Sequence, residues 1–242
     1  MKRLSLFIVI LVSALLPSLS QGQGNYAIPL IGSQAPSFTA KTTNGDLSFP
    51  SDYGNSWKIL FSHPKDFTPV CSSELIELAN LQPEFAKLNT KVVVLSTDNL
   101  QQHKDWKSSL ETVKYEGETT PEIKFPIIDD SDKSISKMYG MLQPASNNDK
   151  DIRGVFIINP ENVVEAVFFY PTDVGRNMNE IVRTVEALQT SQNNIVTPAN
   201  WEPGQDVMLT YMTDAQKKEL EAKSPNIYQI AWYMTLMKYN SH

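Results

Sequence analysis

Short apolar runs bounded by polar residues recur along much of the chain. Three of them are residues 59–61, 92–95 and 155–158. Continuous apolar runs of this length are typical of strands that are covered on both faces. Asn44-Gly45 separates two further runs, and this dipeptide predicts a hairpin with a two-residue turn. The polar residues 159–162 predict a second turn.

Apolar residues at helical spacing predict three helices between these strands. The first runs from about Leu75 to Leu88 and contains Pro83, which is expected to kink it. The second covers residues 100–110, and the third begins near Asn177 with one apolar face. Strands that alternate with helices in this way favour an α/β fold, in which helices flank a central mixed sheet.

The composition changes after Thr190. Residues 192–194 are polar and linker-like, and the tail that follows carries Trp201, a charged segment at 214–222 and the aromatic pair Trp232-Tyr233. We expect a large domain over residues 26–190 and a small C-terminal domain over residues 191–242, which is compatible with a length of 242 residues.

Residues 1–20 have the pattern of a secretory signal peptide: a basic start at Lys2-Arg3, an apolar run from Leu4 to Leu16, and small residues at Ser18 and Ser20. The apolar run is shorter than the roughly 20 residues of a membrane span, so cleavage is favoured over an uncleaved anchor. We therefore predict an exported protein, periplasmic or secreted, with no stable membrane span after cleavage.

Charge and cysteine content exclude several classes of function. A formal net charge of −6 argues against a general nucleic-acid binder, which needs a basic surface. The single cysteine excludes an intramolecular disulfide and any multi-cysteine metal site, and the three scattered histidines do not favour a histidine-built metal centre. Neither a metal nor an organic cofactor is implied.

The single cysteine is either a reactive thiol or a small buried apolar residue. Cys71 follows the predicted strand at 59–61 and the pair Thr68-Pro69. Thr68 is a good N-cap and Pro69 a good first helical residue, so Cys71 is expected in the first turn of a helix. There the free N–H groups and the helix dipole stabilise a thiolate. This order of residues favours the reactive interpretation.

Ionisation of the thiol accounts for only part of a fast reaction. A free cysteine is about 3% thiolate at pH 7, so full ionisation supplies roughly 30-fold, or about 2 kcal/mol. A larger acceleration requires donors aimed at the departing group.

Pro64, Thr68 and Cys71 stand as P-x-x-x-T-x-x-C, which resembles the peroxidatic signature of peroxiredoxins. The run from Ser62 to Cys71, followed by Glu74, is similar to the one-cysteine, peroxiredoxin-six type subfamily. Further similar segments are 125–130, 140–142, the strand that carries Arg153, 170–177 and 196–201. The likeness extends over roughly residues 31–208.

The resemblance implies a thioredoxin-like fold and a thiol-dependent peroxidase in which Cys71 attacks a hydroperoxide and becomes a sulfenic acid. It assigns orientation of the peroxide to Thr68, shielding from water to Pro64, and stabilisation of the thiolate and the O–O bond to Arg153. Supporting positions are Glu74 and Arg176, in a charge network, and His63. The resemblance also implies a homodimer or higher homo-oligomer, formed partly by the C-terminal domain.

No second cysteine exists to resolve the sulfenic acid. Recycling must therefore use an external thiol, or a Cys71–Cys71 disulfide between chains.

Two alternative functions stay open at this point. Some members of the subfamily are credited with phospholipase activity through a G-x-S-x-G-like segment, which here reads Gly54-Asn55-Ser56-Trp57-Lys58. The last glycine is replaced by Lys58 and no histidine precedes the segment, so Ser56 lacks a general base. The other alternative is a redox sensor or holdase, in which oxidised Cys71 bonds to a partner once and does not turn over.

Overall fold

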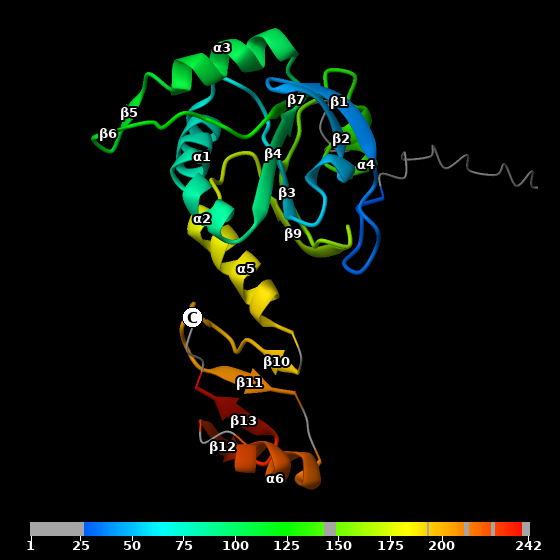
Figure 1. The fold of residues 1–242 in the computed structure, drawn as a ribbon. Helices are drawn as coiled ribbons and strands as arrows, with labels where there is room; N and C mark the ends of the chain where they lie inside the picture. The colour runs from blue at the N-terminus through cyan, green and yellow to red at the C-terminus, as the bar shows by residue number, and fades with distance from the viewer. Residues whose placement is uncertain (1–26, 143–148, 193, 211–212, 224–225, 239–242) are drawn as a thin grey trace, which may run out of the picture.

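The computed structural model describes residues 27–142, 149–192, 194–210, 213–223 and 226–238, so the predicted signal peptide lies outside the described residues. A seven-stranded sheet with the strand order β2-β1-β7-β4-β3-β8-β9 forms the centre of the large domain (Figure 1). Its strands are β1 (Phe38–Thr42), β2 (Gly45–Phe49), β3 (Trp57–Ser62), β4 (Thr90–Ser96), β7 (Ile127–Asp129), β8 (Arg153–Ile158) and β9 (Val164–Tyr170). The sheet is mixed, as predicted, because β3, β4 and β7 run parallel while β8 runs antiparallel to β3.

Helices cover both faces of this sheet. They are α1 (Pro69–Asn80), α2 (Gln82–Lys87), α3 (Leu100–Leu110), α4 (Ser134–Met138) and α5 (Met178–Thr190). A short 3-10 helix, η1 (Ser51–Tyr53), and a small hairpin of β5 (Lys114–Tyr115) and β6 (Glu118–Thr119) complete the domain. None of the described helices is long and apolar enough to cross a membrane.

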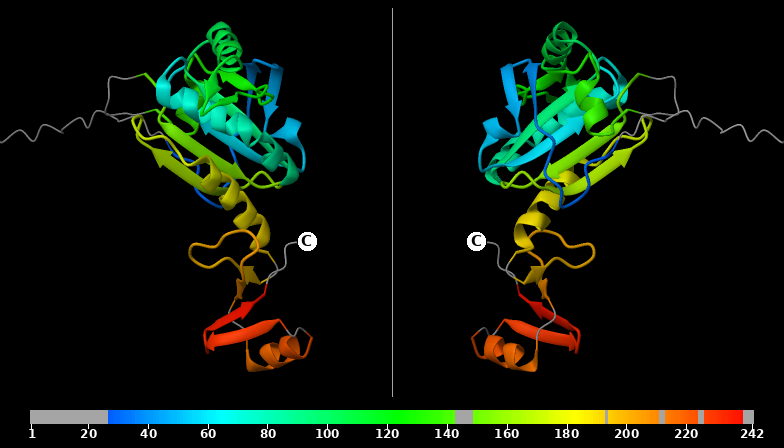
Figure 2. Two further views of the ribbon diagram at one scale, coloured as in Figure 1. Left: turned by 90° about the vertical axis from the view of Figure 1, so that its left-hand side faces the viewer. Right: turned by 90° about the vertical axis from the view of Figure 1, so that its right-hand side faces the viewer.

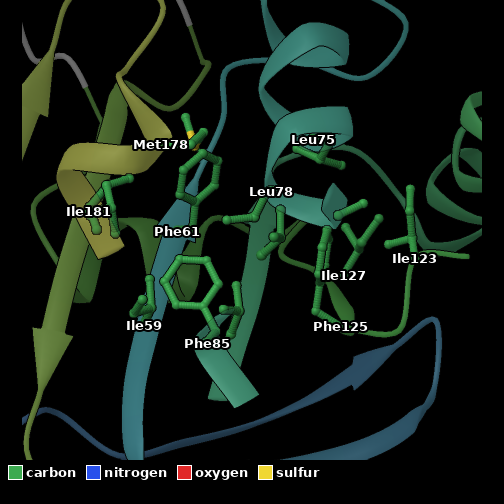
Figure 3. Packing of buried hydrophobic residues seen from close by; sticks show 14 of the residues in the cluster. Ile59, Phe61, Leu75, Leu78, Phe85, Ile123, Phe125, Ile127, Met178 and Ile181 are labelled. Atoms are coloured by element: carbon green, nitrogen blue, oxygen red, sulfur yellow. The ribbon is translucent and has the colours of Figure 1, made fainter. Parts of the chain in front are cut away.

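The alternation of side chains along β3 creates two hydrophobic cores. Ile59 and Phe61 point to one face, where they pack with α1, α2 and α5 (Figure 3). Leu60 points to the other face and packs with the β1–β2 hairpin and α4. Because both faces are covered, every residue of β3 is buried, as the continuous apolar run predicts.

Two predicted details differ in the structure. The hairpin turn consists of Thr43-Asn44 rather than Asn44-Gly45, because Gly45 already pairs with Thr42 as the first residue of β2. Gly45 keeps a φ of +104°, a backbone conformation that favours glycine. The helix predicted with a kink at Pro83 is divided at Leu81 into α1 and α2, with Pro83 in the first turn of α2, where proline is well tolerated.

A separate four-stranded sheet, with the order β10-β11-β13-β12, follows α5. It consists of β10 (Ile195–Val196), β11 (Val207–Leu209), β12 (Ile227–Ala231) and β13 (Met234–Met237), accompanied by α6 (Asp214–Lys223). This unit lies beyond the end of α5, away from the main sheet (Figure 2). Trp201 joins it to α5, since it packs against Ala187 and its carbonyl oxygen accepts a 3.0 Å hydrogen bond from Arg183.

Candidate active site

The loop between β3 and α1 places Cys71 in the first turn of α1. Thr68 is the extended N-cap residue and Pro69 is the first helical residue, as their types predict. The expected capping hydrogen bond of the Thr68 side chain is not formed. Its hydroxyl instead donates a 2.8 Å hydrogen bond to the carbonyl oxygen of Lys65. The lone pairs of this hydroxyl therefore stay available to a donor in the site.

Cys71 is fully buried and is nevertheless in contact with a charged group. Its side chain is 0% exposed and belongs to the core that contains Phe61 and Leu75. Its Sγ accepts a 3.3 Å hydrogen bond from Nη1 of Arg153. Burial of Cys71 therefore does not decide between the two interpretations, because the same buried sulfur also meets a cationic donor.

Arg153 begins β8 and is buried. The Nε and Nη2 atoms of its guanidinium donate to the carbonyl oxygen of Thr172 at 2.9 and 2.5 Å. Nη1 donates to Glu74 Oε2 at 2.7 Å as well as to Cys71. With all three nitrogens engaged, the planar guanidinium is fixed relative to the sulfur.

Glu74 connects the two arginines of the site. It accepts hydrogen bonds from the Nε, Nη2 and backbone N–H of Arg176 at 2.8–2.9 Å. Burial tends to raise the pKa of Glu74, but the hydrogen bonds and charge of Arg176, followed by the charge of Arg153, hold this pKa below its usual range. The carboxylate is therefore ionised and balances part of the buried positive charge.

Arg176 is held on two further sides. Its Nη1 donates to the carbonyl oxygen of Gly154 at 2.9 Å. Its guanidinium carbon lies 3.4 Å from the centre of the Phe61 ring, a distance at which a cation is attracted to an aromatic face. Arg176 thus packs behind Arg153 and Glu74 as part of the same rigid network.

Pro64 is buried in the loop that precedes Cys71, and beside it His63 takes part in a cluster that includes a residue from α3. The Nε2 of His63 and the Nδ1 of His103 each lie 2.7 Å from one carboxylate oxygen of Asp66. All three side chains are fully buried. Burial lowers the pKa of His63 more than Asp66 raises it. For Asp66, burial tends to raise the pKa, but the hydrogen bonds from His103 and His63 keep it below its usual range.

Asp66 and His103 were not predicted as members of the site. Asp66 lies within the peroxiredoxin-like run, whereas His103 belongs to the helix predicted over residues 100–110. The two residues are 37 positions apart, and only the packing of α3 against the β3–α1 loop brings them together.

One group of described residues has metal-ligand types close together: His63, Asp66 and Asp98, with one ligand atom from each within 4.8 Å of the others. His63 and Asp66 are already bonded to each other, and Asp98 accepts a 2.7 Å hydrogen bond from the backbone N–H of Asp66. These contacts account for the group without a metal ion.

The residues of the phospholipase alternative are engaged elsewhere. Ser56 donates to Asn89 Oδ1 at 2.9 Å. Lys58 is buried and its Nζ donates to the carbonyl oxygens of Asn159 and Pro160 and to Asn162 Oδ1. Both histidines that the structure describes bind Asp66. Ser56 directly precedes β3 and His63 directly follows it, so roughly 20 Å of strand lies between them, and His103 is bonded to the same carboxylate as His63. No described histidine is therefore placed to activate Ser56.

A buried thiol at the start of a helix, hydrogen-bonded by a fixed arginine, is the arrangement of a cysteine-dependent redox enzyme. Comparison of the sequence with known protein families leads to the same class. The sequence profile of the AhpC/TSA family matches residues 31–167, and that of the C-terminal domain of 1-Cys peroxiredoxin matches residues 187–223. The chain therefore belongs to the AhpC/TSA family of peroxiredoxins.

Individual relatives extend the match over most of the chain. A peroxiredoxin of Methanosarcina mazei is 43% identical over 87% of this chain and 98% of its own length. Peroxiredoxin-6 of Rattus norvegicus is 42% identical over 80% of this chain and 89% of its own length.

Two solved structures share the fold. One is a cysteine-to-serine mutant of the peroxiredoxin 6 of Arenicola marina, with a TM-score of 0.77 and 32% identity over 88% of this chain and 99% of that chain. The other is yeast mitochondrial 1-Cys peroxiredoxin, with a TM-score of 0.76 and 35% identity over 88% of this chain and 100% of that chain. The predicted family, the thioredoxin-like fold and the thiol-dependent peroxidase function are confirmed.

Proposed function

We propose that Cys71 is the peroxidatic residue of this thiol-dependent peroxidase. Its thiolate attacks one oxygen of a hydroperoxide, so that an S–O bond forms as the O–O bond breaks. The departing oxygen takes up a proton and leaves as water or an alcohol, and Cys71 becomes a sulfenic acid. The observation that carries this proposal is the 3.3 Å hydrogen bond from Arg153 Nη1 to Cys71 Sγ.

The surrounding residues have distinct roles in this step. Arg153 stabilises the thiolate and the charge that develops on the departing oxygen, as preorganised donors do. Thr68 orients the peroxide by accepting a hydrogen bond at its hydroxyl oxygen, since the hydroxyl hydrogen is donated to Lys65 and no capping bond occupies the oxygen. Pro64, which is buried in the loop before Cys71, limits access of water to the sulfur.

Glu74, Arg176 and His63 act through their neighbours. Glu74 fixes Arg153 by a 2.7 Å hydrogen bond, and Arg176 neutralises and orients Glu74. His63 is bonded to Asp66 and so holds the loop that carries Pro64 and Thr68. We regard these three as positioning residues.

The sulfenic acid is reduced by an external thiol. The thiolate of the external reductant attacks the oxidised sulfur of Cys71, and a mixed disulfide forms with loss of water. A second external thiol then attacks the reductant's sulfur and releases Cys71 as the thiol. The yeast mitochondrial 1-Cys peroxiredoxin resolves its thiol via glutathione and thioredoxin systems, and we propose a reductant of this kind here. Because Cys71 is 0% exposed, the first turn of α1 must open before a bulky thiol can reach it.

Intact-mass analysis after one equivalent of hydrogen peroxide tests the peroxidatic role. We expect a rapid gain of one oxygen that a sulfenic-acid trap captures, and no gain in Cys71→Ser. Continued peroxide consumption with added glutathione or thioredoxin distinguishes an enzyme from a sensor, which would be oxidised only once per chain. Full activity in Cys71→Ser would overturn the assignment.

We also propose that the chain forms a homodimer through its C-terminal domain, residues 191–242. The tip of the β12–β13 hairpin supports this, since Ile230, Trp232 and Tyr233 are 60–70% exposed, which is unusual for adjacent large apolar residues. Light scattering should give twice the monomer mass. We expect Ile230→Ser with Tyr233→Ser to weaken the dimer, whereas Leu30→Ser, an exposed apolar change elsewhere, should not. A monomeric wild-type protein would contradict the proposal, and a larger ring would extend it.

Export to the periplasm or the cell exterior is the remaining proposal. It is supported by the basic, apolar and small-residue pattern of residues 1–20. Fractionation of expressing cells should find a protein that has lost about 20 residues outside the cytoplasm. Full-length protein confined to the cytoplasm would contradict it.

A further inference from the structure

A cavity of 470 Å³ lies at the end of the main sheet where the central strand β4 begins. Cys71 lies toward the other end of these strands. Its wall includes Thr90 and Val92, at the start of β4. β3 and β4 run parallel and start together at the pair Trp57 and Thr90. Cys71 follows the far end of β3, so between about 10 Å of strand, measured from Val92, and about 17 Å, measured from Thr90, separates the cavity from that end. The cavity is therefore distinct from the peroxide site.

The short length of β7 explains why this space exists. β7 has three residues and pairs with β4 only from Val94 to Ser96, while its contact with β1 is a single pair at Thr42. Among the described residues, no strand pairs with the first part of β4 on that side. A gap is thus left between β4 and the β1–β2 hairpin, and α2 and residues 124–126 border it.

Side-chain hydrogen bonds hold the walls of this cavity in place. Gln82 on α2 accepts a 2.6 Å hydrogen bond from the backbone N–H of Lys124 and donates to the carbonyl oxygen of Glu122 at 2.9 Å. From the hairpin turn, Asn44 donates to the carbonyl oxygen of Lys124 at 2.9 Å. The same short segment is therefore fixed from two elements, and a preformed site loses less entropy on binding.

The lining combines an apolar surface with two cationic groups. Leu47, Phe85, Val92 and Phe125 supply apolar side chains that are largely buried, and the exposed residues Lys91 and Lys124 supply positive charge. One acidic residue, Asp46, also lines the cavity, but in the hairpin it pairs directly opposite Lys41. Opposite charges across a strand pair attract, so the positive charge of the two lining lysines predominates.

We propose that this cavity binds a small amphipathic carboxylate, with its alkyl chain against Leu47, Phe85, Val92 and Phe125 and its carboxylate group at Lys91 and Lys124. The volume lies within the range of about 300–1,000 Å³ that is typical of small-molecule sites. An apolar lining with a few charged groups at one side is also typical of such sites. The proposal is independent of the thiol chemistry.

Calorimetric titration of the full chain with sodium octanoate tests this site, with 1-octanol as the uncharged counterpart. We expect octanoate to bind and octanol to bind at least about tenfold more weakly, since loss of one charge-assisted contact is worth roughly this much. Lys91→Glu and Lys124→Glu should each weaken octanoate binding by a similar factor. Ala86→Trp, on the exposed side of α2 at the cavity, should abolish binding by filling the space.

Lys87 provides the matched controls, because it is the next residue of α2 and does not line the cavity. Lys87→Glu and Lys87→Trp should bind octanoate like the wild type, and thermal unfolding should show that all variants are folded. Absence of octanoate binding, or binding that none of the lining variants changes, would overturn the proposal. Equal binding of octanol would overturn the role of the two lysines.

Discussion

Glu74 and Arg153 form a buried ion pair in which Glu74 lies on α1, the helix that also carries Cys71, and Arg153 begins β8. Glu74 Oε2 accepts a 2.7 Å hydrogen bond from Arg153 Nη1, and the same nitrogen donates to Cys71 Sγ at 3.3 Å. Glu74 lies three residues after Cys71 on α1, so the two side chains are on the same face of the helix. A single helix therefore carries both the thiol and the carboxylate that fixes its cationic partner.

Removal of the guanidinium should slow peroxide reduction without unfolding the protein. We expect Arg153→Ala to lower the rate constant for oxidation of Cys71 by about 10²–10³-fold, the usual effect of removing one preorganised donor. Stopped-flow measurement at several peroxide concentrations gives this rate constant. Arg183→Lys is the control, because Arg183 binds Glu180 on α5 and lies outside the network. An unchanged rate in Arg153→Ala would return this residue to a structural role.

Neutralisation of Glu74 should destabilise the fold. Glu74→Gln leaves the two buried arginines without their carboxylate, and breaking a buried ion pair in this way costs about 3–5 kcal/mol. For a chain of this size, the loss corresponds to a decrease in Tm of roughly 2–4 °C for each kcal/mol. Glu77→Gln, on the same helix but outside the network, should change Tm little. Equal effects of the two substitutions would show that the pair is not the cause.

Acid should remove the same stabilisation. Because the pKa of Glu74 is lower in the folded protein than its usual value, its contribution to stability is complete above the unfolded pKa of about 4.3. The contribution is lost as the pH falls through the lower, folded pKa. Urea denaturation between about pH 2.5 and 6 should therefore show a steep loss of stability in the wild type and a shallower loss in Glu74→Gln. If stability fell equally with pH in the wild type and in Glu74→Gln, Glu74 would not be the source of the acid sensitivity.

The parts of the molecule that depend on local sequence could be predicted, and the contacts between distant segments could not. The strand at Ile59–Phe61 and the position of Cys71 in a first helical turn follow from neighbouring residues. The bond between Glu74 and Arg176 joins positions 102 residues apart, and only the resemblance to a family placed both in one network. Local sequence can also mislead about a side chain. The residue type of Thr68 predicts a capping hydrogen bond, but its hydroxyl donates to the carbonyl oxygen of Lys65 instead.

The role of His103 was missed for a related reason. A histidine on an amphipathic helix gives no sign of its partner, and Asp66 is identified as that partner only when α3 is packed on the sheet. The cavity next to α2 was also outside the reach of sequence patterns, because it results from the length of β7 relative to β4.

Asp151 provides a last test, because the proposed peroxidase step does not use its carboxyl group. It lies two residues before Arg153 and is fully buried, and neither of its carboxylate oxygens has a hydrogen-bond partner in the described part of the chain. Burial raises the pKa of Asp151 well above its usual range. The nearby Ser136 hydroxyl, which donates to Asp130, opposes this increase, and the charges of Asp130 and Asp98 add to it. An acid with a raised pKa in the folded state destabilises the protein as the pH rises from the unfolded pKa toward the folded one.

Asp151→Asn should therefore stabilise the protein at pH 7, because the amide has a similar shape and no ionisation to suppress. The cost of keeping the carboxyl group protonated at pH 7 is about 1.4 kcal/mol for each unit by which its folded pKa exceeds its unfolded pKa, and we expect an increase in Tm of roughly 2–4 °C for each kcal/mol recovered. The gain should vanish near about pH 4, where the carboxyl group is largely protonated in the folded protein and half protonated in the unfolded one. Asp149→Asn, at an exposed carboxylate that pairs with Lys133, should give no such gain. A lower Tm for Asp151→Asn at pH 7 would mean that the buried carboxylate is ionised and stabilised by a partner.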